Sequence, residues 1–244
     1  MDLRPGERVD DLGRAGLRII QHPGRFPFAI DPVVLAHFVT VSSRARVLDL
    51  GTGSGVIPLL LAALHESATI TGLELQAETA DMAARSVKLN QLEHSIHIDC
   101  GDYRDVGSIY GHGVFDVVTM NPPFREVGTG AISPDEARAT ARHELAGSLD
   151  NALRAAATAV KFGGRVGLVF LAERMVDLVA GLRQYRLEPK RLRFVHPQAG
   201  RRANLLLLEA VKGGGTGLAI EPPLVVHTEG HTFSPEMQAI YSSR

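Results

Sequence analysis

The sequence predicts one α/β domain with a mostly parallel sheet. From residue 46 onward, short apolar strands alternate with helical segments, which is typical of a parallel sheet that helices cover on both faces. A glycine-rich turn joins the first of these strands to the helix after it. Nearer the carboxyl end, two strands follow each other without a helix, and strands joined in this way pair in antiparallel fashion. We therefore expect a parallel sheet that ends in an antiparallel strand.

The residues before the alternating pattern, 1–45, form an irregular leader. One short strand is expected at Leu17–Gln21 and one helix at Val33–Val41. Asp31 is a candidate N-cap for this helix, because its side chain can accept from an unpaired N–H group. Pro32 then fits the first helical position, where its missing N–H costs nothing.

The alternating part covers residues 46–212. Short apolar runs predict its seven strands at 47–50, 68–73, 96–98, 115–120, 165–171, 191–195 and 203–211. Helical spacing of apolar residues and runs of alanine predict its helices at 56–64, 78–89, 135–160 and 173–184. Gly163-Gly164 is expected to end the third of these helices in a turn. A flexible joint, Gly213–Gly217, leads into a tail, 213–244, which we expect to pack on the core with one strand at Leu224–His227.

The composition excludes several classes of protein. The chain has 244 residues, of which 45% are hydrophobic and 22% charged, and these values exclude wholesale disorder. One cysteine, Cys100, rules out an intrachain disulfide and any multi-cysteine metal site, and it fits a reducing compartment, so we expect a cytoplasmic protein. The longest apolar run, Val56–Leu64, is far shorter than the ~20 residues that span a bilayer, and the first residues do not form a signal peptide. We therefore expect no membrane partner.

A glycine-rich turn follows the strand at 47–50. The segment Asp49-Leu50-Gly51-Thr52-Gly53-Ser54-Gly55 leads into the helix at 56–64. Glycine lets the backbone approach a ligand and adopt positive φ, and the start of the helix offers unpaired N–H groups. The spacing is G-x-G-x-G and not the G-x-G-x-x-G of dinucleotide-binding proteins, so the motif alone is also compatible with a plain tight turn.

Two acidic residues follow the next two strands. Glu74 ends the second strand, 19 residues after Gly55, and Asp102 follows the third. The Glu74 carboxylate can accept from both hydroxyl groups of a ribose, and Asp102 could accept from an adenine amino group. Either acid alone could be a solvated loop residue. Ligands of open α/β sheets bind at the carboxyl ends of the strands, however, and all these features meet there.

The fourth strand ends in Asn121-Pro122-Pro123-Phe124. Together with the glycine turn, Glu74 and Asp102, this motif resembles the class I methyltransferases, which use S-adenosylmethionine and share a Rossmann-like domain. Among them, the chain is similar to enzymes with an Asn-Pro-Pro-Tyr or Asn-Pro-Pro-Phe motif. Those enzymes methylate planar nitrogens: adenine N6, guanine N2 or the glutamine amide.

The resemblance implies a fold and a set of site residues. The fold is a seven-stranded sheet with an antiparallel final strand, and the leader, which includes Phe28 and Asp31, closes over the methionine end of the cofactor. The implied cofactor contacts are Asp49, Gly51, Thr52, Gly53, Gly55, Glu74, Asp102 and Asn121. The implied catalytic residues are Asn121, Pro122, Pro123 and Phe124. No metal is implied.

The chemistry of amine methylation explains the residue types of the motif. The exocyclic amine of adenine is a poor nucleophile, because its lone pair is delocalised into the ring. The Asn121 side-chain oxygen and the Pro122 carbonyl can each accept one N–H of this amine, which favours pyramidalisation and frees the lone pair. The two prolines stiffen the backbone, and Phe124 offers a face on which a base can stack.

A closer resemblance is to the bacterial methyltransferases that act on adenine N6 beside the anticodon of a valine tRNA. The matching stretches are 25–31, 72–76, 141–144 and 188–197. The resemblance implies a tRNA substrate. It leaves open the tRNA species, the methylated position, the oligomeric state and whether His143 and Glu144 take part.

The distribution of charge also favours an RNA partner. The chain has a formal net charge of -1, but residues 183–212 contain eight basic and two acidic side chains. A basic surface can hold phosphates while an acidic remainder limits nonspecific binding. The residues that we predict to contact RNA are Lys190, Arg191, Arg193, Arg201 and Arg202. A solvated surface of a loop and a strand is the alternative interpretation.

Two other functions remain open. The first keeps the chemistry and changes the substrate to a protein glutamine amide or a guanine. Enzymes of the glutamine class usually carry a separate helical domain before the core, and the leader is too short for one. The second is a noncatalytic protein that binds S-adenosylmethionine or RNA, although binding alone has no use for two amine acceptors. His227 and His231 are four residues apart, but no further ligand cluster accompanies them, so we expect no metal site.

Overall fold

The computed structural model describes residues 3–22, 29–122 and 149–242. Its strands are β1 (Arg8–Asp11), β2 (Arg18–Gln21), β3 (Arg46–Leu50), β4 (Thr69–Glu74), β5 (Ile96–Cys100), β6 (Phe115–Met120), β7 (Val160–Leu171), β8 (Leu187–Gln198), β9 (Leu205–Lys212), β10 (Ala219–Ile220) and β11 (Leu224–His227). Its helices are α1 (Asp31–Phe38), α2 (Val56–Leu64), α3 (Ala77–Leu89), η1 (Tyr103–Asp105), α4 (Val106–Tyr110), η2 (Ala172–Arg174), α6 (Met175–Gln184) and α7 (Pro235–Ser242). Residues 149–159 are also helical.

The main sheet confirms the predicted fold class. Its strands lie in the order β10-β8-β9-β7-β6-β3-β4-β5, and β11 pairs with β8 as well. Strand β9 pairs in antiparallel fashion with both β7 and β8, and the other pairings in this sheet are parallel. The expected seven strands are therefore present with an antiparallel last member. The short strands β10 and β11 extend the sheet beyond β8.

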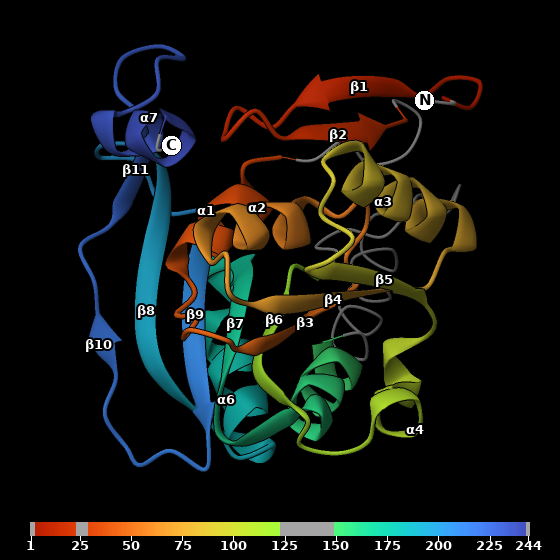
Figure 1. Ribbon diagram of the computed structural model, residues 1–244. Helices are drawn as coiled ribbons and strands as arrows, with labels where there is room; N and C mark the ends of the chain where they lie inside the picture. Colours follow the sequence, from red (N-terminus) through yellow and green to blue (C-terminus); the bar gives the residue numbers. More distant parts are fainter. Residues whose placement is uncertain (1–2, 23–28, 123–148, 243–244) are drawn as a thin grey trace, which may run out of the picture.

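Helices cover both faces of this sheet (Figure 1). Side chains of α1 and α2 form one hydrophobic core with the sheet. Side chains of the 149–159 helix and of α6 form the second core, on the opposite face. Every residue of α2 from Val56 to Ala62 is buried, which explains why its apolar run is continuous and not amphipathic. Within the described part of the chain, no helix has the length and hydropathy to cross a bilayer.

Four local predictions differ from the structure. Helix α1 begins after Ile30, which is its N-cap, and Asp31 is the first helical residue and makes no side-chain cap. Strand β7 begins at Val160 and not at residue 165, because Val160 already pairs with Phe115. The predicted turn at Gly163-Gly164 lies within β7 and does not end the helix. Gly163 has a φ of +76°, and the register with β6 shifts here before pairing resumes at Arg165. The predicted helix at 135–160 ends at 159, and its part before residue 149 lies outside the described residues.

The leader contains a hairpin, β1–β2, which packs on α3 (Figure 1). The Arg85 guanidinium donates to both carboxylate oxygens of Glu7, at 2.7 and 2.5 Å. This hydrogen bonding is the main reason why the pKa of Glu7 falls to about 2. The backbone N–H of Ile20 donates to the Ser86 hydroxyl at 3.0 Å. The leader is thus attached to the helix that follows β4.

A buried carboxylate joins four segments of the fold. Glu209 of β9 is fully buried, and its Oε1 accepts from Arg165 Nη1 of β7 at 2.7 Å. Its Oε2 accepts from the backbone N–H of Thr40, after α1, at 2.7 Å. Arg191 of β8 lies 3.6 Å from the same carboxylate. Burying this charge is favourable only because each oxygen has a hydrogen-bond donor.

This arrangement predicts a large effect of Glu209→Ala on stability. The change leaves Arg165 and the Thr40 N–H without their buried acceptor, so the free energy of unfolding should fall by about 3 kcal/mol. Urea denaturation monitored by circular dichroism measures it. Glu188→Ala is the matched control, because the Glu188–Arg183 pair is exposed on its arginine side and should be worth less than about 1 kcal/mol. Equal effects of the two variants would contradict this account.

Candidate cofactor and substrate site

The glycine turn between β3 and α2 has the backbone that its sequence predicts. Gly51, Gly53 and Gly55 have φ values of +69°, +57° and +90°, a region that side chains disfavour. A Cβ atom at Gly51 or Gly53 would meet no atom within 4 Å, so both positions border open space. Gly55 is the left-handed N-cap of α2, and a Cβ there would lie 3.3 Å from the Ala83 side chain. The turn therefore needs glycine for its conformation and leaves room for a ligand above it.

Asp49 lies directly before this turn and is buried in the sheet. Its Oδ1 accepts from the Thr119 hydroxyl of β6 at 2.7 Å. Its Oδ2 is buried and has no hydrogen-bond partner among the described residues, and the same holds for the Thr52 hydroxyl. Burial raises the pKa of Asp49 to about 7, against the opposing effect of the hydrogen bond from Thr119. The site thus contains a carboxyl group that titrates near neutrality and has a free acceptor atom.

Glu74, at the end of β4, holds the glycine turn in place. Its Oε2 accepts from the backbone N–H of Gly53 at 2.9 Å, and its Oε1 accepts from that of Gln76 at 3.0 Å. The residue is 9% exposed. Each carboxylate oxygen can accept more than one hydrogen bond, so these contacts leave capacity for ligand hydroxyl groups. The sequence alone did not indicate the bond between Glu74 and the turn.

Asp102, after β5, makes local contacts. Its Oδ1 accepts from the backbone N–H of Arg104 at 2.8 Å, and its Oδ2 accepts from the Arg104 Nε at 2.8 Å. The guanidinium of Arg104 lowers the pKa of Asp102. Asp102 therefore caps η1 and remains charged at neutral pH.

Asn121 and Pro122 directly follow β6. Leu50 pairs with Met120, so Asn121 leaves the sheet beside Gly51. The Asn121 Oδ1 is buried and has no hydrogen-bond partner among the described residues. A buried amide oxygen without a donor costs free energy unless a ligand or water satisfies it. Pro123, Phe124, His143 and Glu144, as well as Phe28 of the leader, lie outside the described residues.

The structure adds Thr119 to the residues that sequence reasoning selected. It is fully buried, and its hydroxyl joins β6 to the carboxyl group of Asp49. Gly72, opposite Asp49 on β4, leaves space for the Thr52 hydroxyl, since a Cβ at Gly72 would lie 2.8 Å from that oxygen. Thr119 is the polar residue in the otherwise apolar run 117–120, and this feature of the sequence could have identified it as a site residue.

The five basic residues that we predicted to contact RNA differ in their contacts. Three of them contact the tail. Lys190 Nζ donates to Gly215 O at 3.0 Å. Arg191 Nε donates to Glu221 at 2.7 Å. Arg193 forms an ion pair with Glu236 at 2.7 Å.

The other two predicted RNA contacts, Arg201 and Arg202, are exposed in the loop between β8 and β9. Among the described residues, neither side chain forms an ion pair or a hydrogen bond.

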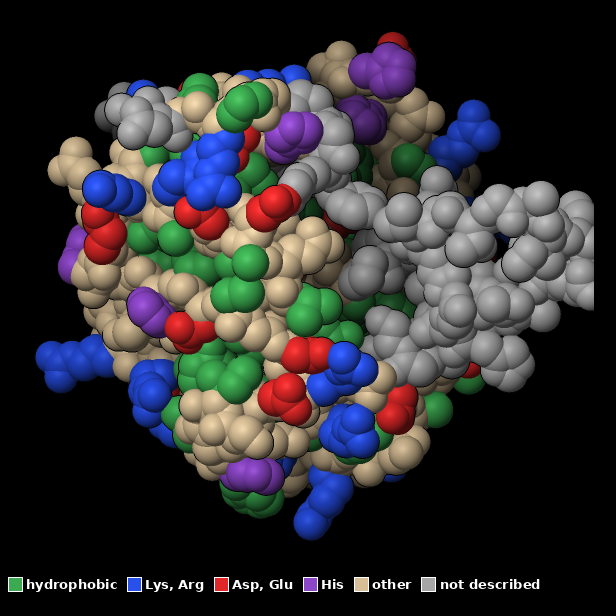
Figure 2. Space-filling model, turned by 90° about the vertical axis from the view of Figure 1, so that its right-hand side faces the viewer, with side chains coloured by type: hydrophobic (Ala, Val, Ile, Leu, Met, Phe, Trp, Pro, Cys, Tyr) green, Lys and Arg blue, Asp and Glu red, His purple; other side chains and the backbone are tan. Residues whose placement is uncertain are grey.

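On the face shown in Figure 2, the described Lys and Arg side chains lie among Asp and Glu side chains, with apolar surface between them. Charge on that face therefore does not indicate an RNA-binding surface.

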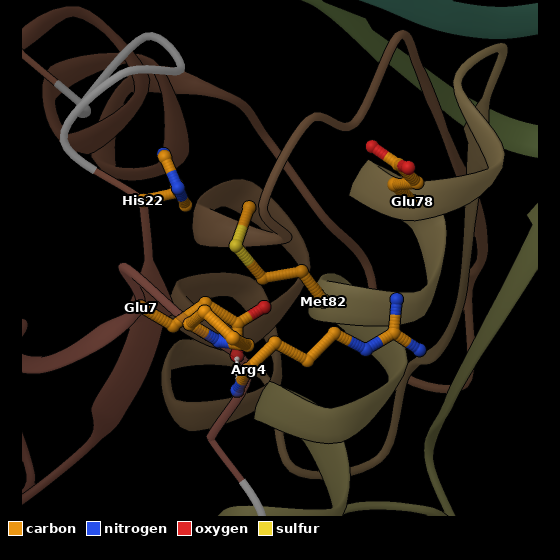
Figure 3. A pocket seen from close by; sticks show the side chains of 6 residues that line it. Arg4, Glu7, His22, Glu78 and Met82 are labelled. Atoms are coloured by element: carbon orange, nitrogen blue, oxygen red, sulfur yellow. Dashed lines mark hydrogen bonds between the residues drawn. The ribbon is translucent and has the colours of Figure 1, made fainter.

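A small cavity of about 150 Å³ lies between the first residues of the leader and α3 (Figure 3). Its lining residues are Arg4, Pro5, Glu7, His22, Glu78 and Met82. The Arg4 N–H donates to Glu7 at 2.7 Å, and the Arg4 guanidinium pairs with Asp81 at 2.9 Å. No sequence-predicted site residue lines it. The cavity therefore belongs to the attachment of the leader to α3.

The two histidines of the tail have structural contacts. The His227 ring stacks on Phe233 with ring centroids 5.3 Å apart, and its Nδ1 lies 3.3 Å from Pro197 O. His231 meets His227 edge to face. In the described ranges, no three His, Cys, Asp or Glu side chains gather as a metal site would require.

Comparison with known proteins agrees with this geometry. Residues 17–169 match the family described as "Methyltransferase small domain". The chain is 31% identical to "tRNA1(Val) (adenine(37)-N6)-methyltransferase" of Porphyromonas gingivalis, over 78% of this chain and 75% of that protein. It is also 31% identical to the protein of the same name from Aeromonas salmonicida, over 84% of each chain.

A solved structure with the same fold is that of a predicted O-methyltransferase from Agrobacterium tumefaciens. The TM-score is 0.71 at 25% identity, over 86% of this chain and 95% of that one. The family match covers the glycine turn, Glu74, Asp102 and Asn121. The chain belongs to the methyltransferase small domain family and is a methyltransferase that uses S-adenosylmethionine.

Proposed function

We propose that this protein transfers a methyl group from S-adenosylmethionine to the exocyclic N6 of an adenine in RNA, in tRNA near the anticodon. The observation that carries the proposal is the buried Asn121 oxygen, which has no donor among the described residues and lies beside the glycine turn. A free acceptor at this position suits an amine with two N–H groups to donate. The names of the two relatives above support adenine in tRNA as the target.

The residues at the edge of the sheet fit the cofactor. Bound S-adenosylmethionine supplies an electrophilic methyl group on a positively charged sulfur. The open backbone of Gly51 and Gly53 and the unsatisfied oxygens of Asp49 and Thr52 would face its methionine end. Glu74 would accept from the ribose hydroxyls.

Asp102 would accept from the adenine amino group of the cofactor, through lone pairs that Arg104 leaves available. The same Arg104 contacts keep the carboxylate charged, because they lower its pKa. A charged acceptor makes the stronger hydrogen bond to an amino group.

The substrate amine would be activated by two acceptors on a stiff backbone. The Asn121 Oδ1 and the Pro122 carbonyl each take one N–H, which pyramidalises the nitrogen and directs its lone pair outward. Transfer leaves the nitrogen positively charged, and it then loses one proton to water, so no residue has to act as a general base. On sequence grounds, Pro123 adds stiffness and Phe124 provides a stacking face for the base.

Thr119 would help to position both the cofactor contact at Asp49 and the amine acceptor at Asn121. Its hydroxyl orients the Asp49 carboxyl group, and it lies on β6 two residues before Asn121, which directly follows this strand. Asp49 pairs with Thr119 and Leu50 pairs with Met120, so the end of β6 holds Asn121 beside the glycine turn. A shift of β6 relative to β3 would therefore disturb the cofactor contact and the amine acceptor together.

Asn121→Ala should lower kcat by a factor of about 100 to 1,000, because one preorganised acceptor of the amine is lost. The affinity for S-adenosylmethionine should change little. The assay is transfer of a radiolabelled methyl group to total RNA and to total protein from cells that lack the gene. Asn151→Ala, in the 149–159 helix, is the matched control and should retain activity.

Two outcomes of this assay would be decisive. Label in protein and none in RNA would refute the RNA substrate and favour the glutamine amide. Full activity of Asn121→Ala would refute the role of the amide oxygen.

Asp49 predicts that cofactor affinity depends on pH. Its pKa is about 7 in the free protein, and the ionised form attracts the positive groups of S-adenosylmethionine. The dissociation constant should therefore fall as the pH rises from about 6 to about 8. Isothermal titration calorimetry over this range measures it, with Asp49→Asn as the variant that should remove the dependence. The same pH dependence in the wild type and in Asp49→Asn would contradict the assignment.

A further inference from the structure

The loops that follow β7 and β8 lie at the same edge of the sheet as Asn121. Met120 pairs with Leu168, and Leu171 at the end of β7 pairs with Leu205. The backbone N–H of Ala172 donates to Asn204 O at 3.1 Å, so the two loops are joined. Three strand spacings separate β6 from β8, which is roughly 14 Å at ~4.8 Å each. A single-stranded RNA segment bound at Asn121 would therefore pass close to both loops.

Arg174, in the loop after β7, has an unsatisfied donor. Its guanidinium lies over the Phe170 ring, 5.5 Å from the centroid, and its Nε donates to Asp177 at 3.2 Å. Its Nη1 is buried and has no hydrogen-bond partner among the described residues. The side chain as a whole is 16% exposed. Only the Nε–H of this guanidinium is paired among the described residues, so its two terminal nitrogens remain available to an anionic oxygen. Phosphate is the anion that RNA presents, and a guanidinium held on two sides is preorganised to bind it.

The loop after β8 presents Arg201 and Arg202 to solvent from a tight turn. Gly200 has a φ of +74°, and the Arg201 N–H donates to Gln198 O at 3.1 Å. The Arg201 carbonyl lies 2.6 Å from His196 Nδ1. The backbone of this loop is therefore held by hydrogen bonds, while its two guanidinium groups extend from it.

Three other basic residues of the 183–212 segment are less suited to phosphate. Lys190, Arg191 and Arg193 hold the tail against β8, as described above. The acids at the loops after β7 and β8 are Glu173 and Asp177, so the local excess of positive charge is small. Binding here would depend on individual directed guanidinium contacts more than on net charge.

We propose that Arg174, Arg201 and Arg202 form a phosphate-binding rim that seats the RNA strand while the target adenine enters the site at Asn121. This inference rests on the proposed function, because it takes RNA as the substrate. Arg174 contacts a phosphate close to the target nucleotide, and Arg201 and Arg202 contact phosphates farther along the strand. Recognition of the backbone by arginine fixes the register of the RNA without reading its bases.

The test is binding of an unmodified RNA hairpin with the anticodon stem and loop of tRNA1(Val), measured at several salt concentrations. Arg174→Gln and the double variant Arg201→Gln with Arg202→Gln should each raise the dissociation constant roughly tenfold or more. The slope of log K against log salt should become shallower by about 0.7 for each lost phosphate contact on a single strand. Arg174→Lys should recover part of the affinity as a point charge.

The matched control is Arg183→Gln. Arg183 lies at the far end of α6, away from these loops, and its loss changes the charge by the same amount as Arg174→Gln. RNA affinity and salt slope should stay as in the wild type. Each variant should also retain the wild-type affinity for S-adenosylmethionine, which shows that the fold is intact.

The outcomes separate this inference from the proposed function. If the wild type binds and methylates the hairpin and the variants of Arg174, Arg201 and Arg202 match it, the rim is refuted and the function stands. If the Arg183→Gln control loses as much affinity as these variants, binding follows net charge and the rim is likewise refuted. If the wild type neither binds nor methylates the hairpin but methylates protein, the proposed function fails and the rim with it.

Discussion

The register of three neighbouring parallel strands determines where the parts of the site lie. Asp49 of β3 stands opposite Gly72 of β4 and Thr119 of β6. Because the three strands run in the same direction, the residues that follow them leave the sheet at one edge. The glycine turn, Glu74 and Asn121 therefore meet at this edge, although they are spread over 71 positions of the chain. Hydrogen bonds from Thr119 to Asp49 and from Gly53 to Glu74 fix these strand ends relative to one another.

Buried polar atoms of this protein fall into two groups: those that are fully hydrogen-bonded stabilise the fold, and those without a partner point to a ligand site. The Glu209 carboxylate is fully buried and has donors on both oxygens, so it stabilises the packing of α1, β7 and β8 against β9. Asp49, Asn121 and Arg174 each have a buried polar atom without a partner among the described residues. Such atoms are costly in a finished core. Their occurrence near one edge of the sheet is what an open ligand site predicts.

The sequence predicted the fold and the positions of the candidate site residues, but not their contacts. Short apolar strands and helical spacing are local signals, so β6 and β11 begin and end at the predicted residues. A residue at the end of a correctly predicted strand is also correctly placed, which explains why the positions of Glu74 and Asn121 could be predicted. Lys190, Arg191 and Arg193 were grouped by closeness in sequence, whereas their partners lie in the tail or at α1. The hairpin strand β1 and helix α7 are short and lack strong periodicity, so no local signal predicted them.

The central claim is that the strand-end site delivers a methyl group to the N6 of adenine. The most direct measurement is mass spectrometry of nucleosides from the valine tRNA of cells that lack the gene, with and without the restored protein. Our account predicts N6-methyladenosine in this tRNA only when the protein is restored with Asn121 intact. Methylguanosine in its place, or methylglutamine in protein with unchanged tRNA, would contradict it.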